Sequence, residues 1–547
     1  LQTDSMVRYY IGVDVGTHSV RAGLVDGDGV IHRTAEEKIT ILHPKSNYYM
    51  QSSSEIWRKC CLVVKVNVMC NVDSSDVHGI GFDATCSLVV LDTQFKPLSV
   101  SDTKNEDYNI IMWMDHRAME QAEFINNTKH EALKFVGGKI SLEMQPPKLL
   151  WLKQMLPDCW KKAGHFFDLS DFLTFKCTGS LSRSSCSVTC KWLYSAYHGW
   201  DDGFWTLIGL GDLIEDNYAK IGDKVLAPGT AVKDGLTHTS ALEMGLVGGT
   251  AVATSMLDAH CGGLGCLGLN GSMMDDKLQL TECLAMICGT SSCHMAISKD
   301  PVFVPGVWGP YNSAMIPHLW LSEGGQTAAG KLVDHIISTH PANSELQKLA
   351  HGRGTDIYSC LNDVLADHVK DSGHDIDELS RDIHMQPDHH GNRSPLANPS
   401  LTGALCGLTL DTSLQQLACL YLATMQSLAC GSRHIVDTME KHGHKIKAIF
   451  MCGGLTKNQL FVQIHSNVMD RPVILSRESE TVLLGGAILA ACASPHFTSI
   501  QEAMGKMCCP GDIIQPIQHL HEFYEKKYTV FLQMIKNQQG YQQIMRK

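Results

Sequence analysis

Two stretches of this chain repeat one pattern of strand, hydroxyl-rich turn and strand, and this repeat limits the possible folds most strongly. In Tyr9–Asp26, apolar residues alternate with small or polar ones on both sides of the turn 16–19, a period of two that predicts a β-hairpin. Leu284–Ser298 has the same form around the turn 289–291. About half of the 547 residues separate the two turns, so the sequence predicts a duplicated fold with two lobes.

The chemistry of these turns suits an anion. A glycine that can take positive φ is followed by hydroxyl donors, so the N–H groups of the turn can converge on a phosphate. Asp14 beside such a phosphate is electrostatically reasonable only if a cation such as magnesium lies between them, directly or through water. The alternative is an ordinary hairpin with a surface aspartate. Two such hairpins, one per half, favour lobes that face each other over a polyphosphate.

The charge balance argues against polyanionic partners. The chain has 45 Lys and Arg against 57 Asp and Glu, a formal net charge of −12, which attracts neither nucleic acid nor anionic membranes. A small-molecule partner is therefore expected. The length of 547 residues permits about three or four domain-sized units, or two large lobes.

The 21 cysteines predict buried, reduced thiols in an intracellular protein, because they lie in apolar stretches and no two are separated by just two residues. We therefore expect neither a disulfide framework nor a zinc framework. The 27 histidines include clusters such as His442/His444 and His389-His390, but these clusters lack Cys or carboxylates at ligand spacing, which favours solvated or core histidines. No apolar run has the length of a membrane span and the first residues lack a signal-peptide pattern, so a cytoplasmic protein is expected.

Several carboxylates follow predicted strands, where α/β folds place ligands. Asp83 and Asp115 both lie at such strand ends, although an isolated aspartate there is more often a helix or turn cap. Asp258 is the strongest candidate, because it is the one acid in the stretch 248–268, where a predicted buried strand at 252–257 is followed by a glycine-rich helix or turn that carries Asp258. Glycines on both sides of a lone carboxylate indicate a backbone that approaches something closely.

Three further side chains are candidates for the site, and two of them, Lys191 and Arg393, have two readings each. Lys191 is by default a surface lysine, and the alternative is a hydrogen-bond donor in a pocket bordered by Trp192 and Tyr194. Glu323 is expected at the end of a strand at 318–321, with a helix opening at 322–326. Arg393, in a turn, either holds a carboxylate or caps a loop.

A βαβ unit is predicted at 448–473, with Gly453 and Gly454 in a turn that feeds a helix from about Lys457. Such a turn lets a planar or sugar group lie against bare backbone. The helix at 480–493 carries a Gly-Gly pair that suits either tight helix packing or nucleotide contact. Further helices are expected at 56–72 and 414–441.

Together these motifs resemble the FGGY family of carbohydrate kinases over nearly the whole chain, from Tyr10 to about Met507. D-V-G-T-H-S-V-R at 14–21 and I-C-G-T-S-S at 287–292 are similar to the two phosphate motifs of the family, and M-C-G-G-L-T-K-N at 451–458 to its adenosine motif. Within the family, the D-ribulokinase group is the most similar, on the motifs W-M-D-H-R-A at 113–118, L-D-A-H-C-G-G-L-G at 257–265, E-G-G-Q at 323–326 and H-G-N-R-S-P at 390–395.

The resemblance implies an α/β fold of two actin-like, ribonuclease-H-like ATPase lobes with a cleft between them. It implies an N-terminal lobe at 6–265 with the sugar site and the first phosphate hairpin, a nucleotide-binding C-terminal lobe at 266–500, and a helical tail at 501–547 packed on the second lobe. A homodimer is compatible with the resemblance.

The implied function is ATP-dependent phosphorylation of a ketopentose, with D-ribulose converted to D-ribulose 5-phosphate and Asp258 as general base. The alternatives are L-ribulose, D-xylulose or a pentitol as substrate, or a non-catalytic nucleotide-dependent sugar sensor. ATP and magnesium are the implied cofactors, with Asp14 organising the metal. The residues implied to contact the sugar are Asp83, Ala84, Asp115, Lys191, Asp258 and Glu323, and those implied to contact ATP are Gly16, Thr17, His18, Gly289, Thr290, Ser291, Gly453, Gly454 and Asn458.

Two departures from the family pattern stand out. Cys261 occupies a position where relatives usually carry a small residue such as alanine, a substitution that we expect to be tolerated. The valine-rich stretch 61–70 is less helical than the pattern requires, which leaves the end of that helix open.

Overall fold

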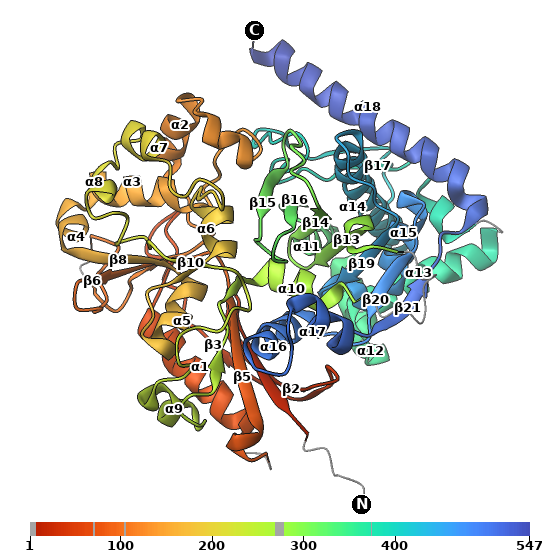
Figure 1. The fold of residues 1–547 in the computed structure, drawn as a ribbon. Helices are drawn as coiled ribbons and strands as arrows, with labels where there is room; N and C mark the ends of the chain where they lie inside the picture. Colours follow the sequence, from red (N-terminus) through yellow and green to blue (C-terminus); the bar gives the residue numbers. More distant parts are fainter. Residues whose placement is uncertain (1–6, 69–71, 103–104, 269–277, 373–374, 547) are drawn as a thin grey trace, which may run out of the picture.

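The protein consists of two lobes, each built on a central β-sheet (Figure 1). The computed structural model describes residues 7–68, 72–102, 105–268, 278–372 and 375–546. Among these residues, no helix combines the length and the apolar character needed to traverse a bilayer. The expectation of a two-lobed α/β fold is confirmed.

Both central sheets share a plan, in which an antiparallel hairpin has an antiparallel strand next to it on one side and two parallel strands next to it on the other. The first sheet contains β1 (Tyr9–Val15), β2 (Ser19–Asp26), β3 (Ile31–Lys38), β5 (Val77–Ala84), β11 (Ala251–Val252) and β12 (Met256–Leu257). The second contains β13 (Cys283–Cys288), β14 (Ser292–Ser298), β15 (Trp308–Asn312), β16 (Trp320–Gln326), β19 (Ala448–Cys452), β20 (Val473–Ser476) and β21 (Pro510–Ile514). The second sheet adds one antiparallel strand at each edge, β15 and β21.

The first lobe carries a second, smaller sheet and a layer of helices. The smaller sheet contains β4 (Met50–Gln51), β6 (Leu88–Asp92), β7 (Ile110–Ile111) and β8 (Ala163–Asp168). The helices before residue 268 are α1 (Ser53–Val68), α2 (Met119–Asn127), α3 (Gln145–Met155), α4 (Pro157–Lys162), α5 (Leu169–Thr178), α6 (Ser185–Lys191), α7 (Asp202–Leu207), α8 (Asp212–Glu215), α9 (His238–Met244) and α10 (Asp258–Cys266). The helix expected at 56–72 corresponds to α1, and the end of that prediction, 69–71, lies outside the described residues.

The second lobe surrounds its sheet with longer helices. These are α11 (Gly330–Thr339), α12 (Asn343–Arg353), α13 (Ile357–Ser372), α14 (Leu414–Lys441) and α15 (Gln459–Met469). The prediction of a long helix at 414–441 is confirmed, and Ser413 caps it by accepting a hydrogen bond from the N–H of Gln416. The strand pair β17 (His384–Gln386) and β18 (Ala404–Cys406) lies beside α14.

A helix from late in the chain lies directly against the first sheet. This helix, α16 (Thr481–Ala493), approaches β1 and β5 so closely that only glycine fits at the contacts. A Cβ built on Gly12 would lie 2.0 Å from the carbonyl oxygen of Leu483, and one on Gly81 would lie 2.2 Å from that of Gly486. On its other side, α16 packs against α10, where a Cβ on Gly265 would lie 1.9 Å from the carbonyl oxygen of Thr481. The Gly-Gly pair of this helix therefore serves tight packing.

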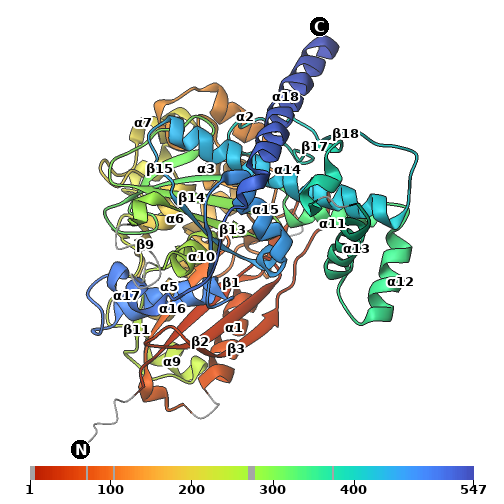
Figure 2. The same cartoon turned by 90° about the vertical axis from the view of Figure 1, so that its right-hand side faces the viewer.

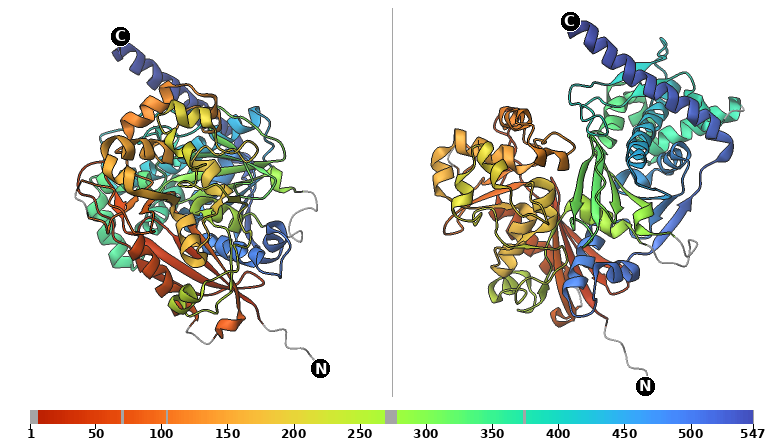
Figure 3. Two further views of the ribbon diagram at one scale, coloured as in Figure 1. Left: turned by 60° about the vertical axis from the view of Figure 1, so that its left-hand side comes forward. Right: turned by 45° about the horizontal axis from the view of Figure 1, so that its top comes forward.

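The last two α-helices of the chain lie against different lobes (Figures 2 and 3). The helix α17 (Ile500–Met507) lies next to the β2–β3 turn of the first sheet, since a Cβ on Gly29 would meet the carbonyl oxygen of Met507 at 1.8 Å. The helix α18 (His521–Arg546) runs along the second lobe, where the Lys527 ammonium donates to the carbonyl oxygens of Ser380 and Ile383 at 2.6 and 2.7 Å.

The second sheet differs from the sequence prediction at Glu323. We expected a strand that ends at residue 321 and a helix that opens at 322–326, whereas β16 continues to Gln326 and the helix α11 begins only at Gly330. Gly324 and Gly325 do not break the strand here. A Cβ on Gly324 would lie 2.7 Å from the Cγ2 atom of Ile435 in α14, so the glycine admits a helix that packs on the sheet.

A cavity of about 820 Å³ lies between the two lobes. Its walls carry aromatic side chains from both, including Tyr194, Tyr197 and Trp200 from the first lobe and Trp320 from the second. Tyr197 and Trp320 stack across it with ring centroids 5.5 Å apart. The cavity separates parts of the two lobes, but none of the residues predicted to contact the sugar or ATP lines it.

Candidate active site

The carboxyl ends of three parallel strands in the first sheet lie side by side. The strand β1 pairs with β5 so that Asp14 lies opposite Asp83, and β12 pairs with β5 so that Leu257 lies opposite Ala84. Asp258 follows Leu257 directly and begins α10. The alignment therefore gathers three predicted acids, Asp14, Asp83 and Asp258, at one edge of the sheet.

These acids influence one another. Burial, followed by the charges of Asp14 and Asp258, raises the pKa of Asp83 well above its usual range. Neither carboxylate oxygen of Asp83 has a hydrogen-bond partner within the described part of the chain. Asp258 is partly exposed, and desolvation together with the charge of Asp14 raises its pKa to about 6, against the opposing hydrogen bond from the N–H of Ala259 at 2.7 Å. A carboxylate with such a pKa is a stronger proton acceptor than an ordinary aspartate.

Asp14 is held by an arginine from the neighbouring strand. The Nε atom of Arg21 donates to Asp14 at 3.0 Å, and its Nη1 atom lies 2.6 Å from Glu480, the residue before α16. The guanidinium therefore connects the first sheet to the late helix that covers it.

The first predicted phosphate turn is anchored from two directions. The backbone N–H of Gly16 closes the turn, and the indole Nε1–H of Trp113 donates to the hydroxyl of Thr17 at 3.0 Å. The amide of Gln51 donates to the carbonyl oxygen of Thr17 at 3.0 Å. The His18 side chain is exposed. The turn is thus fixed while its outer face stays accessible.

The second predicted phosphate turn occupies the equivalent place in the second sheet. The N–H of Gly289 donates to the carbonyl oxygen of Ser291 at 2.9 Å. In the first turn, the N–H of Gly16 donates to the carbonyl oxygen of Ser19 at 3.0 Å. The N–H groups of Ala329 and Gly330 donate to the carbonyl oxygens of Thr290 and Gly289 at 2.8 and 3.0 Å. The start of α11 therefore holds this turn in place.

The predicted adenosine turn lies beside the second phosphate turn, because β19 runs parallel to β13. Gly453 has φ +98°, and a Cβ there would lie 2.5 Å from the carbonyl oxygen of Cys288, so this position requires glycine. Gly454 is exposed, with open space where a Cβ would point. The side chain of Asn458 is engaged within the protein, where it caps α15 and donates to the hydroxyl of Tyr421 at 2.5 Å.

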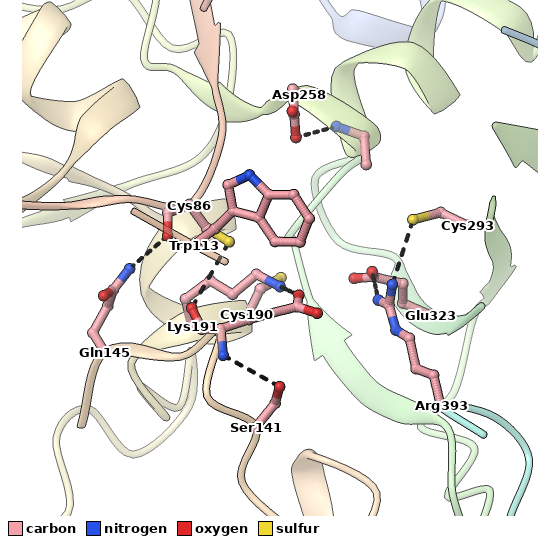
Figure 4. A network of polar contacts seen from close by, with 12 residues as sticks. Cys86, Trp113, Ser141, Gln145, Cys190, Lys191, Asp258, Cys293, Glu323 and Arg393 are labelled. Carbon is pink, nitrogen blue, oxygen red and sulfur yellow. Dashed lines mark hydrogen bonds and ion pairs between the residues drawn. The ribbon is translucent and has the colours of Figure 1, made fainter. Parts of the chain in front are cut away.

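Glu323 joins the two lobes through buried ion pairs with His260 and Arg393. Figure 4 shows the pair with Arg393. One carboxylate oxygen lies 2.9 Å from Nε2 of His260 in α10, and the other accepts from Arg393. Burial alone would raise the pKa of Glu323, but the charges of Arg393 and Lys191 hold it well below its usual range. Arg393 holds a carboxylate, so the first of the two alternatives for this residue is confirmed.

Lys191 is buried, so the default reading of a surface lysine is wrong. Its ammonium lies 3.8 Å from the Glu143 carboxylate and 4.5 Å from the centroid of the Trp308 ring, over which Arg393 also lies at 4.0 Å. Figure 4 shows Lys191 and Asp258 on one side of the site, and the pair of Glu323 and Arg393 on the other side.

Asp115 makes its contacts away from Lys191, Glu323 and Arg393. Its carboxylate is buried and is occupied by Arg117, at 2.6 and 2.8 Å, and by the backbone N–H of Tyr49 at 2.7 Å. In this structure Asp115 orders the loop that presents Trp113.

Sequence reasoning overlooked the polar residues that support the site from a distance in the chain. Gln145, buried at the start of α3, donates to the carbonyl oxygen of Cys86 at 3.1 Å and to Asp168 at 3.0 Å. The Glu143 carboxylate lies near the Lys191 ammonium, and the charged groups of Lys191 and Arg393 both lie over the Trp308 ring. No local pattern marks these residues, although Trp113 lies within a motif that the resemblance already singled out.

Comparison with known proteins agrees with this geometry. Residues 9–265 match the N-terminal domain of the FGGY family of carbohydrate kinases, and residues 284–494 match its C-terminal domain. The chain belongs to this family. The resemblance inferred from the motifs is therefore confirmed, and the protein is a carbohydrate kinase.

Relatives of this FGGY kinase include an FGGY carbohydrate kinase domain-containing protein of Homo sapiens, 53% identical over 542 residues, with 98% of each chain covered. A D-ribulokinase of Saccharomyces cerevisiae is 38% identical over 527 residues, which cover 91% of this chain and 74% of the yeast protein. The crystal structure of a ligand-bound xylulose kinase from Lactobacillus acidophilus has a TM-score of 0.80 at 17% identity, with 97% of this chain and 98% of that one covered. This last likeness concerns the fold.

Proposed function

We propose that this kinase transfers the γ-phosphoryl group of ATP to the terminal hydroxyl of D-ribulose, forming D-ribulose 5-phosphate and ADP. The observation that carries the proposal is the partly exposed Asp258 carboxylate at the shared edge of β1, β5 and β12, opposite the Glu323 and Arg393 pair. The choice of D-ribulose is supported by the 38% identity to the yeast D-ribulokinase.

The two hydroxyl-rich turns, with Thr17 and Thr290 at their tips, would hold the phosphates through backbone and hydroxyl donors. Gly453 and Gly454 would leave room for the adenosine, with Asn458 bordering that site. The carboxylates of Asp14 and Asp83 are hard oxygen donors, and neither Asp83 oxygen has a hydrogen-bond partner among the residues that the structure describes, so these residues fit magnesium. Magnesium held there, directly or through water, would neutralise phosphate charge.

Asp258 would accept the proton of the sugar hydroxyl while the hydroxyl oxygen forms its bond to the γ-phosphorus and the bond to the β-phosphate oxygen breaks. Lys191 and Glu323 would orient the other sugar hydroxyls, with Asp83 and Ala84 lining the sugar site and Asp115 acting through its loop. Ion pairing of these charges within the protein limits the rearrangement needed when the sugar binds.

ADP release with magnesium-ATP tests the substrate. A panel of D-ribulose, L-ribulose, D-xylulose, ribitol and glycerol should give the highest kcat/KM with D-ribulose. A higher value with another pentulose or with ribitol would leave the kinase chemistry in place and reject D-ribulose. ATP binding without turnover on any sugar would reject the catalytic proposal in favour of a nucleotide-dependent sugar sensor.

The hydrogen bond from Trp113 to Thr17 should contribute moderately to turnover. Trp113→Phe keeps the aromatic ring and removes the N–H donor, and a hydrogen bond of this kind contributes about 0.5–1.5 kcal/mol. We expect kcat/KM for ATP to fall by about two- to tenfold. Trp57→Phe, which removes the indole donor to Glu243 at 2.8 Å, is the matched control and should leave this value unchanged. Equal values for both variants and the unmodified chain would show that the Thr17 contact is dispensable.

A further inference from the structure

Behind the proposed sugar site, two thiols and an imidazole meet in the protein interior. The Nδ1 atom of His260 lies 3.1 Å from Sγ of Cys186 and 3.9 Å from Sγ of Cys190. The three atoms all lie within 4.8 Å of one another, and all three side chains are buried. Thiolate sulfur and imidazole nitrogen are the ligands that zinc and cuprous ions prefer.

The local structure places these ligands together. Cys186 and Cys190 are four residues apart in α6, so both project from one face of the helix. His260 lies in the first turn of α10, and the backbone N–H of Leu257, just before that helix, donates to Sγ of Cys186 at 3.4 Å. The cluster therefore joins α6 to the first turn of α10, two helices that the chain order separates by about 70 residues.

The imidazole has the orientation expected of a metal ligand. Its Nε2 atom lies 2.9 Å from the Glu323 carboxylate, which is itself fixed by Arg393. A proton on Nε2 satisfies that carboxylate and leaves the lone pair of Nδ1 directed at the two sulfurs. Metal-binding histidines commonly donate their second ring N–H to a carboxylate in this way.

The two distances from His260 Nδ1 to the sulfurs are close to what one ion requires. Zinc binds sulfur at about 2.3 Å and nitrogen at about 2.0–2.1 Å, so ligand atoms around a tetrahedral ion lie about 3.5–3.9 Å apart. The observed distances of 3.1 and 3.9 Å reach this range with shifts of less than about half an ångström. On binding, each thiol would release its proton to solvent and become a thiolate ligand.

We propose that Cys186, Cys190 and His260 form a buried site for a thiophilic d¹⁰ cation, Zn²⁺ or Cu⁺, that ties α6 to α10. Lys191 directly follows one ligand and Asp258 precedes another by two residues, so the ion fixes the spacing between the two helices that carry them. The sequence gives no sign of such a site, because its three ligands do not follow the spacing of zinc motifs in the chain.

Metal content of the full-length protein tests the proposal independently of activity. The protein is purified without chelator and its zinc and copper are measured by mass spectrometry, for the unmodified chain, the double variant Cys186→Ser/Cys190→Ser and the matched control Cys360→Ser, a buried thiol in α13. We expect about one ion per chain in the unmodified protein and the control, and at least a tenfold loss in the double variant. Equal content in all three, or none after exposure to Zn²⁺ and to Cu⁺, would overturn the site.

X-ray absorption of the metal in the unmodified protein covers the case in which the double variant does not fold. Two sulfur neighbours and a nitrogen neighbour from imidazole would support the assignment, with the absorption edge identifying zinc or copper. A first shell of four sulfurs, or of nitrogen and oxygen alone, would contradict it and leave the thiols as hydrogen-bond donors to His260.

Discussion

Asp258→Asn is expected to lower kcat by about 10²- to 10⁴-fold, the range over which a positioned general base contributes. The amide keeps the shape of the side chain and cannot accept the proton of the sugar hydroxyl. Because the charge of Asp258 adds to the repulsion around Asp83, its removal should not weaken the binding of an anionic nucleotide. Single-turnover phosphorylation measures the chemical step, and calorimetry measures ATP and sugar binding, which should change by less than about threefold.

Asp28→Asn makes the same chemical change at an exposed aspartate outside the site and should leave kcat unaltered. A kcat for Asp258→Asn within tenfold of the unmodified chain would mean that another group takes the proton. Asp83 would then be the next residue to test, since it lies at the same sheet edge.

The second large effect concerns stability. Gly12→Ala should destabilise the protein by about 3 kcal/mol or more, at or above the upper end of the usual cost of overpacking. The new Cβ would lie 2.0 Å from the carbonyl oxygen of Leu483 and 2.8 Å from the backbone nitrogen of Ala487, and a backbone helix cannot move aside as a flexible side chain can. The expected result is a clear fall in the urea midpoint, followed by circular dichroism.

Gly27→Ala is the matched control, because a Cβ there meets nothing within 4 Å. Its urea midpoint should stay within the error of the unmodified chain. If Gly12→Ala and Gly27→Ala gave the same midpoint, α16 would not pack on β1 as closely as the structure has it.

Local patterns were sufficient to predict the elements whose partners are near in the chain. The alternation in Tyr9–Asp26 corresponds to β1 and β2, and the apolar spacing at 414–441 corresponds to α14. Both signals arise within one element or one hairpin. The register of β1, β5 and β12, which gathers Asp14, Asp83 and Asp258, could be anticipated only in outline, because it depends on strands from distant parts of the chain.

The errors have a common physical cause. Gly324 and Gly325 look in sequence like part of a segment that opens a helix, but in the structure they lie in β16 and make room for α14 and for the backbone of β14. Lys191 looks like a surface lysine, but Glu143 and the Trp308 ring lie around its ammonium. In each case the deciding neighbour is supplied by tertiary packing, and no residue within a few positions reports it.

The contact between Arg21 and Glu480 has a consequence for how the chain is made. The two residues are 459 positions apart. A ribosome that adds about 5–20 residues per second therefore synthesises Glu480 roughly 20–90 s after Arg21. During that interval the glycine face of the first sheet is uncovered, with its backbone and buried apolar strands exposed to other nascent chains. Chaperones that shield such surfaces should therefore affect the yield of this protein more than that of one whose lobes are each completed by adjacent sequence.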